Sequence, residues 1–228
     1  MNDRSVNSPE MSSLAVDEKP YCIRLAKHED IDALTDLHMK SFRPSEHVPV
    51  MLGKKYVRAT YRWQIDGDSA YVLLAEEANK IIGLIGVCDG FFTGRMFKAC
   101  LPEFLLSLAR NPLLLLTKKL WERLFWRLDT NKRSGQIVKT LGFAQMTIGA
   151  VDEKYRGKGV FPELVEASKK YSRERGSRAI RAGVYKNNMS SRRVFIKGNW
   201  LEISKLETAD TVHYVFFIDP EFQKEMGI

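Results

Sequence analysis

The sequence predicts an α/β (α+β) fold, because it contains both a strand pair and a β-α-β unit. Apolar runs at 71–75 and 81–88 are joined by a short polar link, which is typical of adjacent antiparallel strands. Farther along, a strand over 144–151, a helix over 161–175 and a strand over 179–185 follow in the order of a β-α-β unit. Strands and helices are therefore expected to share one core.

The remaining segments fit the same class. Residues 1–19 are polar and are expected to form a disordered lead-in, after which 20–228 form a single domain. Before the strand pair, we expect a strand at 21–25 and helices at 28–42 and 50–65, the second ending near Gly67. After the β-α-β unit, we expect a helix at 189–197 and strands at 202–206 and 211–218, around the turn 208–210.

Residues 91–143 depart from this pattern and are predicted to form a helical insertion, divided by Pro102 and Pro112. Within it, a basic amphipathic helix is predicted over 113–128. Five leucines share one of its faces: Leu113, Leu116, Leu120, Leu124 and Leu128. Such a stripe either packs as a cap on the protein's own core or rests on an anionic membrane surface. Both interpretations stay open from the sequence.

The charge balance favours an anionic partner. The chain has 36 Lys and Arg residues against 28 Asp and Glu residues, a net charge of +8. Nucleic acid, an anionic membrane surface and a polyphosphate cofactor are all attracted by such a field. No recognised nucleic-acid-binding motif accompanies the charge, so we expect no nucleic-acid partner.

The cysteines and the apolar runs indicate a cytoplasmic protein. Cys22, Cys88 and Cys100 form no CxxC pair, and an odd number argues against a disulfide framework. The polar N-terminal segment has no apolar core of the signal-peptide kind. The longest apolar run, 113–116, is far shorter than the roughly 20 residues that cross a bilayer.

A basic, glycine-containing turn at 151–160 connects a predicted strand to a predicted helix. Gly157 and Gly159 let the backbone approach a ligand, and the first turn of the helix leaves N–H groups unpaired beside the positive end of its dipole. Arg156 and Lys158 add formal positive charge. The turn is therefore a candidate phosphate site, although Gly-Lys-Gly also occurs in ordinary loops.

An ordered set of residues around this turn resembles the GNAT superfamily of N-acetyltransferases. The family motif Gln/Arg-x-x-Gly-x-Gly/Ala is matched by 156–161 up to its last position. Asn188, Phe195 and Trp200 then fall at the family spacings. The resemblance implies the GNAT fold, a mixed and mostly antiparallel central sheet flanked by helices. It also implies acetyl-CoA as the acyl donor.

The resemblance implies which residues bind the cofactor. The strand around Ile148, Gly149, Ala150 and Val151 would offer backbone groups to the pantetheine arm, as an added strand does. The pyrophosphate would be held by Arg156, Gly157, Lys158, Gly159, Val160 and Phe161. Asn188 would bond farther along the cofactor, or else cap the following helix. No metal is implied.

The catalytic residues cannot be carried over directly. In the family mechanism an amine attacks the thioester, a base accepts the amine proton and an acid protonates the thiolate. Phe195 stands where the family often has the tyrosine acid, so either Tyr185 replaces it or the thiolate leaves unassisted. Phe161 and Asn199 also depart from the Gly or Ala that are usual.

The base has two candidates from position alone. Asp89 follows the strand at 81–88, and His47 lies in a proline-bounded loop that often borders the acceptor site in such folds. Each also has an ordinary structural interpretation, Asp89 as a turn residue before Gly90 and His47 as a surface residue. His213, in the last predicted strand, is expected to be structural.

The acceptor is predicted to be a small primary amine. The pattern at 38–61, followed by the insertion, resembles GNATs of bacterial surface-polysaccharide and amino-sugar biosynthesis. That likeness implies an amino sugar whose phosphates Arg95 and Lys98 would help to bind. Acetylation of a protein N-terminus or lysine, a non-catalytic acyl-CoA-binding module, and assembly as a homodimer are the alternatives that stay open.

Overall fold

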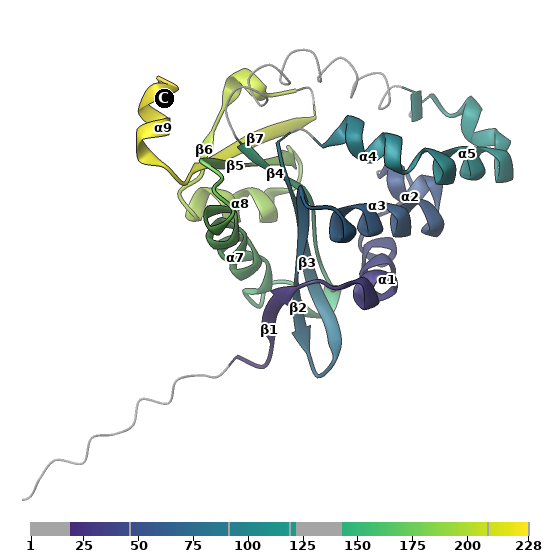
Figure 1. The fold of residues 1–228 in the computed structure, drawn as a ribbon, viewed down its shortest axis with the longest axis horizontal. Helices are drawn as coiled ribbons and strands as arrows, with labels where there is room; N and C mark the ends of the chain where they lie inside the picture. The colour runs from purple at the N-terminus through teal and green to yellow at the C-terminus, as the bar shows by residue number, and fades with distance from the viewer. Residues whose placement is uncertain are drawn as a thin grey trace, which may run out of the picture.

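The computed structural model describes residues 19–45, 47–90, 92–118, 120–121, 143–208 and 210–227. Its centre is a seven-stranded sheet in the order β1-β2-β3-β4-β5-β7-β6 (Figure 1). The strands are β1 Cys22–Leu25, β2 Ala70–Glu77, β3 Lys80–Asp89, β4 Phe143–Val151, β5 Ala179–Tyr185, β6 Leu201–Glu202 and β7 Thr211–Phe217. Neighbours pair antiparallel except β4 and β5, which are parallel. The predicted mixed, mostly antiparallel sheet is confirmed.

Helices lie on both faces of this sheet. The α-helices are α1 Ile31–Ser41, α2 Val48–Leu52, α3 Lys54–Asp66, α4 Thr93–Ala99, α5 Leu101–Arg110, α7 Val160–Glu174, α8 Met189–Lys197 and α9 Pro220–Glu225. Short 3-10 turns are found at η1 His28–Asp30, η2 Pro112–Leu116, η3 Glu153–Tyr155 and η4 Ser204–Leu206. Figure 1 shows α7 and α8 on one side of β3, and α1 to α5 on the other.

The two faces bury separate apolar cores. On the face that carries α7, Val160 and Leu164 pack with Ile85 and Val87 of the sheet. On the face that carries α1 and α3, Leu34 and Val57 pack with sheet residues such as Leu84. A sheet that is covered on both sides explains why β2 and β3 read as continuous apolar runs instead of alternating ones.

The sheet opens between β4 and β5. These strands pair only from Phe143 opposite Ala179 to Gln145 opposite Arg181, although each strand continues beyond that point. On its other side β4 stays paired with β3 as far as Val151, with a register irregularity at Thr147. We call the gap between 146–151 of β4 and 182–185 of β5 the wedge, and its closed end at Gln145 and Arg181 the vertex.

Several sequence expectations need correction. The helix predicted over 50–65 is two helices, because Gly53 between them has φ +96°, which a helix cannot contain. The strand predicted over 202–206 is a two-residue strand followed by η4. Of the helix predicted over 113–128, residues 112–116 form a 3-10 turn, since Pro112 begins a new segment, and 122–128 lie outside the described residues.

The insertion begins as a helical layer beyond α3. Side chains of α4, α5 and η2, such as Met96, Phe104 and Leu114, pack with Tyr56 of α3 in a third apolar cluster. Within the described ranges, no helix is both long and apolar enough to cross a bilayer. The short α9, which no sequence pattern predicted, packs Phe222 against Phe143 at the start of β4 and Val215 near the end of β7.

The β2–β3 turn provides a test of the fold. Ala78 and Asn79 have φ values of +47° and +62°, as in the type I′ turns that form the two-residue loops of β-hairpins. Because alanine in this region is strained, Ala78→Gly should raise the free energy of unfolding by about 0.5–1 kcal/mol. The matched control is Ala33→Gly on the exposed face of α1, which should lower it by about 0.5–1 kcal/mol. Urea denaturation of both variants measures the two signs, and a loss of stability at position 78 would contradict the prediction.

Candidate functional site

The predicted phosphate turn is built by two left-handed glycines. Asp152 accepts a hydrogen bond from the Lys154 amide and starts η3, after which Gly157 has φ +77°. Gly159, with φ +85°, is the residue at which α7 begins. A Cβ is disfavoured at such φ values, so glycine at both positions is what allows the chain to turn from β4 into α7 within a few residues.

The beginning of α7 carries unpaired hydrogen-bond donors. No side chain caps the helix, and among the described residues the amides of Gly157, Gly159, Val160 and Phe161 donate to no protein acceptor. Their partial charges add to the positive end of the dipole of a 15-residue helix. An anion of phosphate size fits this arrangement, because it accepts several hydrogen bonds at once.

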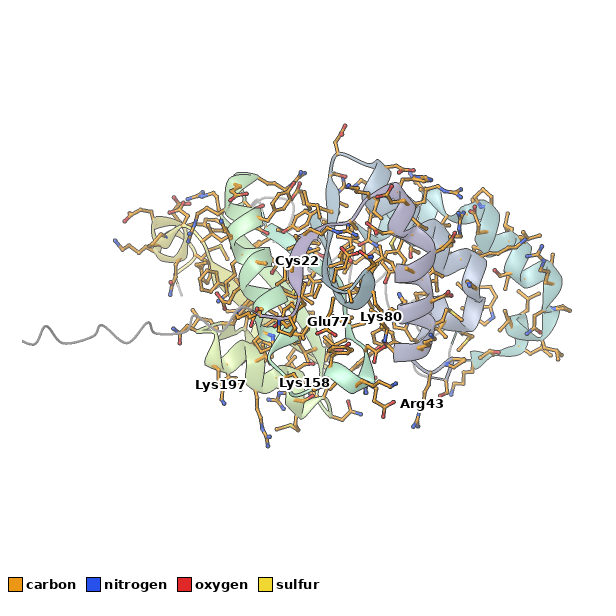
Figure 2. All side chains as sticks on the ribbon, turned by 90° about the horizontal axis from the view of Figure 1, so that it is seen from below. Cys22, Arg43, Glu77, Lys80, Lys158 and Lys197 are labelled. Carbon is orange, nitrogen blue, oxygen red and sulfur yellow. The ribbon has the colours of Figure 1, made fainter. Side chains whose placement is uncertain are left out.

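Cationic side chains surround the same turn. Arg156 donates from Nε to the carbonyl of Val151 at 3.2 Å, which fixes its stem beside the end of β4. Lys80 and Lys158 lie 5.6 and 5.2 Å from the centre of the Tyr155 ring, whose hydroxyl donates to Glu77. In Figure 2, seen from below, Glu77, Lys80 and Lys158 are labelled close together near the middle of the view.

The wedge offers backbone groups to an extended ligand. Ile148, Gly149, Ala150 and Val151 pair on one side with β3, from Gly86 to Gly83. On the side toward β5 they have no strand partner, since β4 and β5 have already separated. A ligand with amide groups can bond there as an added strand would. The four predicted pantetheine residues and the phosphate turn are therefore continuous along β4.

The departure at Phe161 has a structural partner. A Cβ added to Gly149 would lie 2.8 Å from Cε2 of Phe161, closer than real Cβ contacts. The Phe161 ring also meets Phe195 edge to face, with centroids 6.1 Å apart. The large residue at the last motif position is therefore accommodated by a glycine on β4.

Asn188 is used as a helix cap. Its Oδ1 accepts from the Ser191 amide at 3.2 Å and so begins α8. The NH2 end of the Asn188 side chain only donates, so its Nδ2 hydrogens are not part of this cap and remain the atoms that a cofactor would use. The capping role and the predicted binding role are compatible.

Phe195 is a core residue. Its side chain is buried and stacks on Tyr214 with ring planes 10° apart, while Trp200 meets it edge to face. A phenyl ring in this position contributes packing and has no proton to donate.

His47 belongs to a cluster of aromatic and polar side chains near the C-terminal end of α1. Its Nδ1 lies 3.3 Å from Nε2 of His38, and the other ring nitrogen of His38 lies 2.9 Å from the Tyr61 hydroxyl. Phe42 stacks on the His47 ring at 4.6 Å. Burial lowers the pKa of His38 to about 4, so that imidazole is neutral at pH 7.

Asp89 lies far from the phosphate turn. It is opposite Ala144 at the start of β4, and seven residues of strand, about 23 Å, separate that point from Val151. Its Oδ2 is 2.5 Å from Nη2 of Arg175, a contact that raises the pKa of Arg175, whereas its Oδ1 is buried without a partner. Asp89 thus holds the end of α7 against the sheet.

Tyr185 ends β5 on the far side of the wedge from β4. It is opposite Thr211 of β7, and its side chain is 37% exposed. The structure therefore brings Tyr185 to the wedge and places Asp89 and His47 in other clusters.

Four polar residues that the sequence did not single out for function surround the vertex. Gln145 of β4 is opposite Arg181 of β5, and His213 of β7 is opposite Gly183. Thr147, at the irregularity of β4, donates to Gln64 of α3 at 2.6 Å. In the sequence these residues look like ordinary polar positions of strands, and only the order of the strands brings them together.

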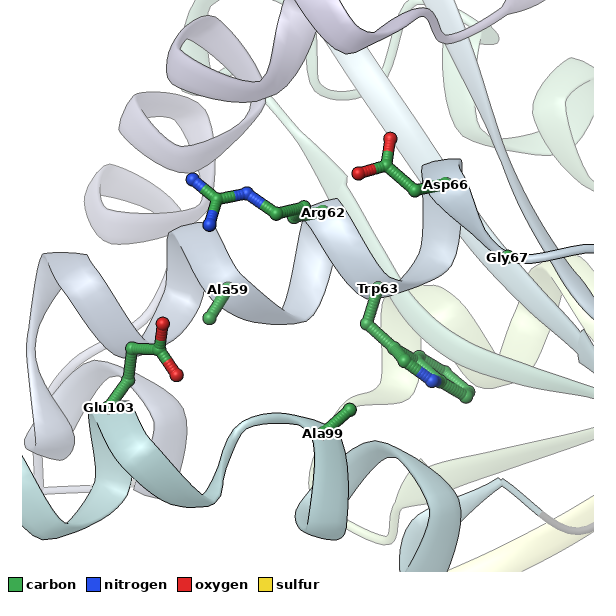
Figure 3. A pocket seen from close by; sticks show the side chains of 7 residues that line it. All are labelled: Ala59, Arg62, Trp63, Asp66, Gly67, Ala99 and Glu103. Carbon is green, nitrogen blue, oxygen red and sulfur yellow. The ribbon is translucent and has the colours of Figure 1, made fainter.

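A shallow cavity of about 280 Å³ lies elsewhere, between α3 and the α4–α5 layer (Figure 3). Its lining residues are Ala59, Arg62, Trp63, Asp66, Gly67, Ala99 and Glu103. None of them belongs to the phosphate turn or the wedge, so this cavity is separate from the candidate site.

The comparisons with known proteins agree with the geometry. Residues 121–197 match the model of the acetyltransferase (GNAT) family, a segment that includes β4, the phosphate turn, α7 and β5. The predicted resemblance to this superfamily is confirmed, while the finer likeness to amino-sugar enzymes is not. No curated protein matches the sequence at a significant level.

Solved structures share the fold at low sequence identity. An N-acetyltransferase from Staphylococcus aureus Mu50 aligns with TM-score 0.53 and 14% identity, over 88% of this chain and 100% of that one. PaiA N-acetyltransferase from Thermoplasma acidophilum, in complex with coenzyme A, aligns with TM-score 0.55 and 11% identity, over 86% and 98%. YncA of Salmonella typhimurium, with acetyl-CoA, aligns with TM-score 0.53 and 15% identity, over 89% and 96%.

The contact between Gly149 and Phe161 can be tested by a double-mutant cycle. Gly149→Ala forces its methyl group against the Phe161 ring and should lower the free energy of unfolding by about 1–3 kcal/mol. Adding Phe161→Ala should remove most of that effect. Gly94→Ala, where the new methyl group meets open space, is the control and should not destabilise. If Gly149→Ala and Gly94→Ala had equal free energies of unfolding, the proposed contact would be contradicted.

Proposed function

We propose that this chain, a member of the GNAT acetyltransferase superfamily, is an N-acetyltransferase that moves the acetyl group of acetyl-CoA to a primary amine of a small molecule. The observation that carries the proposal is the continuity of an uncapped helix start, left-handed glycines and an open strand edge along one path from α7 to β4. That path offers hydrogen-bond donors for a phosphate first and strand-like backbone groups next. Coenzyme A presents its pyrophosphate and its amide-containing pantetheine arm in the same order.

The cofactor's place follows from its length. With the pyrophosphate at Gly157 to Phe161, the pantetheine arm would run along β4 away from the turn. Its chain of about a dozen bonds corresponds to roughly four extended residues. Counted back from Val151, four residues end at Thr147, where the β4 register is irregular. The thioester would therefore lie close to the vertex of the wedge.

The reaction at this point is a direct transfer. The lone pair of a neutral amine nitrogen forms a bond to the thioester carbonyl carbon, and the carbonyl oxygen becomes negative. Backbone N–H groups of β4 that face the wedge would stabilise that charge. When the intermediate collapses, the C–S bond breaks, the amine loses one proton and the thiolate of coenzyme A takes one up. Acetylated amine and free thiol are the products.

We propose candidates for the acid and the base of the two proton transfers. Tyr185 is the candidate acid, because it ends β5 at the open end of the wedge, from where its long side chain would have to reach back toward the thioester, and because Phe195 is buried in the core. His47 and Asp89 are the candidate bases, although Asp89 is paired with Arg175 and His47 is in contact with His38. An unassisted thiolate departure is the alternative for the acid.

The acceptor class is likewise a proposal. An amino sugar is what the family likeness implies, with Arg95 and Lys98 of α4 as phosphate contacts. Arg95 already donates to Ser69, Cys88 and the carbonyl of Asp89. We place the proposed enzyme in the cytoplasm, as one domain over 20–228. Vesicle binding would measure contact of 113–128 with a membrane, and light scattering would measure pairing as a homodimer.

Cofactor binding is tested at Gly159. Gly159→Val places a β-branched side chain at φ +85° beside the proposed pyrophosphate and should abolish acetyl-CoA binding. Gly176→Val is the matched control, because Gly176 has φ +77°, equally open surroundings and a position at the other end of α7. At a hundredfold excess over its Kd, acetyl-CoA should stabilise the wild type and the control by about 2.7 kcal/mol. Equal ligand-induced shifts in both variants would refute the site.

The acid is tested at Tyr185. Tyr185→Phe removes only the hydroxyl from an exposed side chain, so the fold should persist while kcat falls by about 100-fold. The KM for acetyl-CoA should stay unchanged, since the hydroxyl acts on the leaving thiolate. Thiol-release assays give both constants, with Tyr171→Phe, near the C-terminal end of α7, as the control. An unchanged kcat would mean that the thiolate leaves without an acid.

A further inference from the structure

Three polar side chains lie on one face of the sheet at the vertex of the wedge. Gln145 and Arg181 are opposite each other in parallel strands, so both side chains project to the same side. That side carries α1 and α3, because Cys88, opposite Gln145, alternates with Gly86, which faces Gln64 of α3.

His213 belongs to the same group. It is opposite Gly183, two residues beyond Arg181 on β5, and therefore projects to the face of Arg181. A Cβ on Gly183 would be 3.0 Å from Cε1 of His213, so the imidazole lies over a glycine that leaves room for it. Side chains from three strands thus converge at one place.

Two of these side chains bury polar atoms without a protein partner. Gln145 is 3% exposed, and its Nε2 makes no hydrogen bond to any residue that the structure describes. Nδ1 of His213 is also buried and unpaired. An unsatisfied buried donor or acceptor costs about 1–3 kcal/mol, so two such atoms at one place indicate that something else bonds to them.

Arg181 is a cation without a counter-ion in the part of the chain that the structure describes. Among the described residues no carboxylate pairs with it and no acceptor binds its guanidinium, whereas Arg175, Arg178 and Arg192 each have acidic partners. Burial lowers the pKa of Arg181 to about 10. Burial, and secondly the charge of Arg181, lower the pKa of His213 to about 4, so His213 stays neutral.

The groups around the vertex are therefore donors with one net positive charge. Arg181 supplies a planar fork of N–H groups, Gln145 supplies an amide, and a neutral His213 supplies either an N–H or a lone pair. Arg95, which contacts Cys88 opposite Gln145, donates to Ser69, Cys88 and the Asp89 carbonyl. A single free cation with a planar fork matches a monoanion of carboxylate shape.

We propose that Arg181, Gln145 and His213 form a carboxylate-binding subsite at the vertex, so that the acceptor is an amine that also bears a carboxylate, as an amino acid does. This inference rests on the proposed acetyltransferase function. The subsite lies where the thioester would end, so an acid group held there places a nearby amine against the carbonyl carbon. Arg181 is then the residue that selects the substrate, and it takes no part in the proton transfers.

The experiment uses the full chain, acetyl-CoA and matched pairs of acceptors. Each L-amino acid is assayed for thiol release beside its own carboxamide, and amino sugars are assayed with and without a phosphate. The acid of a productive pair should show a kcat/KM at least tenfold above that of its amide. Thermal shift with the same acids, at saturating coenzyme A, measures acceptor binding without turnover.

Variants connect the preference to the subsite. Arg181→Gln should remove the preference for acids over amides and the thermal shift with acids, while leaving the shift with acetyl-CoA unchanged. Its melting temperature should equal or exceed that of the wild type, because a partly buried charge with no described partner is gone. Arg181→Lys keeps the charge without the fork and should retain part of the preference. Arg110→Gln, at the exposed end of α5, is the control and should change nothing.

The outcomes separate the two proposals. If acetyl-CoA fails to stabilise the wild type, the proposed function itself is wrong. If acetyl-CoA binds but no carboxylate-bearing amine binds or reacts, or if Arg181→Gln keeps the preference, the subsite is wrong and the function stands. A preference for phosphorylated amines that is lost in both Arg181→Gln and Arg95→Gln would replace the carboxylate by a phosphate and overturn the assignment.

Discussion

The separation of β4 from β5 after three residue pairs is the constraint on which the rest of the site depends. Strand edges are normally paired or protected, because open N–H and C=O groups attract other chains. Here the open edge lies inside the sheet, where only a narrow extended ligand can reach it. The parallel direction of the two strands also matters, because it puts the phosphate turn and Tyr185 at one end of the gap and the vertex at the other. The fold thereby orders a ligand along its length before any side chain acts.

Side-chain packing keeps this gap open. On the α7 face, Phe161 fills the space over Gly149 and reaches Phe195, which stacks on Tyr214. On the opposite face, Thr147 and Gln64 bond to each other across Gly86, where a Cβ would lie within 2.5 Å of both oxygens. Two glycines on neighbouring strands thus allow large or polar groups to approach the strand backbone from both sides. The departures from the family motif are compensated locally, so they do not argue against cofactor binding.

The sequence was sufficient to predict those elements whose signal lies in residues close together in the chain. The hairpin, the β-α-β unit and the glycines of the turn each depend on residues close in the chain, and each is confirmed by the described elements. It failed where one residue overrides a periodic pattern, as Gly53 does, and where an element is held by distant contacts, as α9 is by Phe222. The group at the vertex could not be found in this way. Gln145, Arg181 and His213 are far apart in the chain, and only the strand order β4-β5-β7 makes them neighbours.

The same reasoning explains why the donor half of the site is easier to assign than the acceptor half. Coenzyme A would be bound largely by backbone groups, and a backbone site needs only glycines, a helix start and an open edge, all of which leave a sequence signature. The proposed acceptor recognition would use side chains at strand positions, where any polar residue looks like a solvent-facing one. Arg175 and Arg178 each pair with a carboxylate, whereas Arg181 has no such partner among the described residues. A partly buried cation without a protein partner is costly, and for the proposed acyltransferase the molecule that would supply an anion at that place is the substrate.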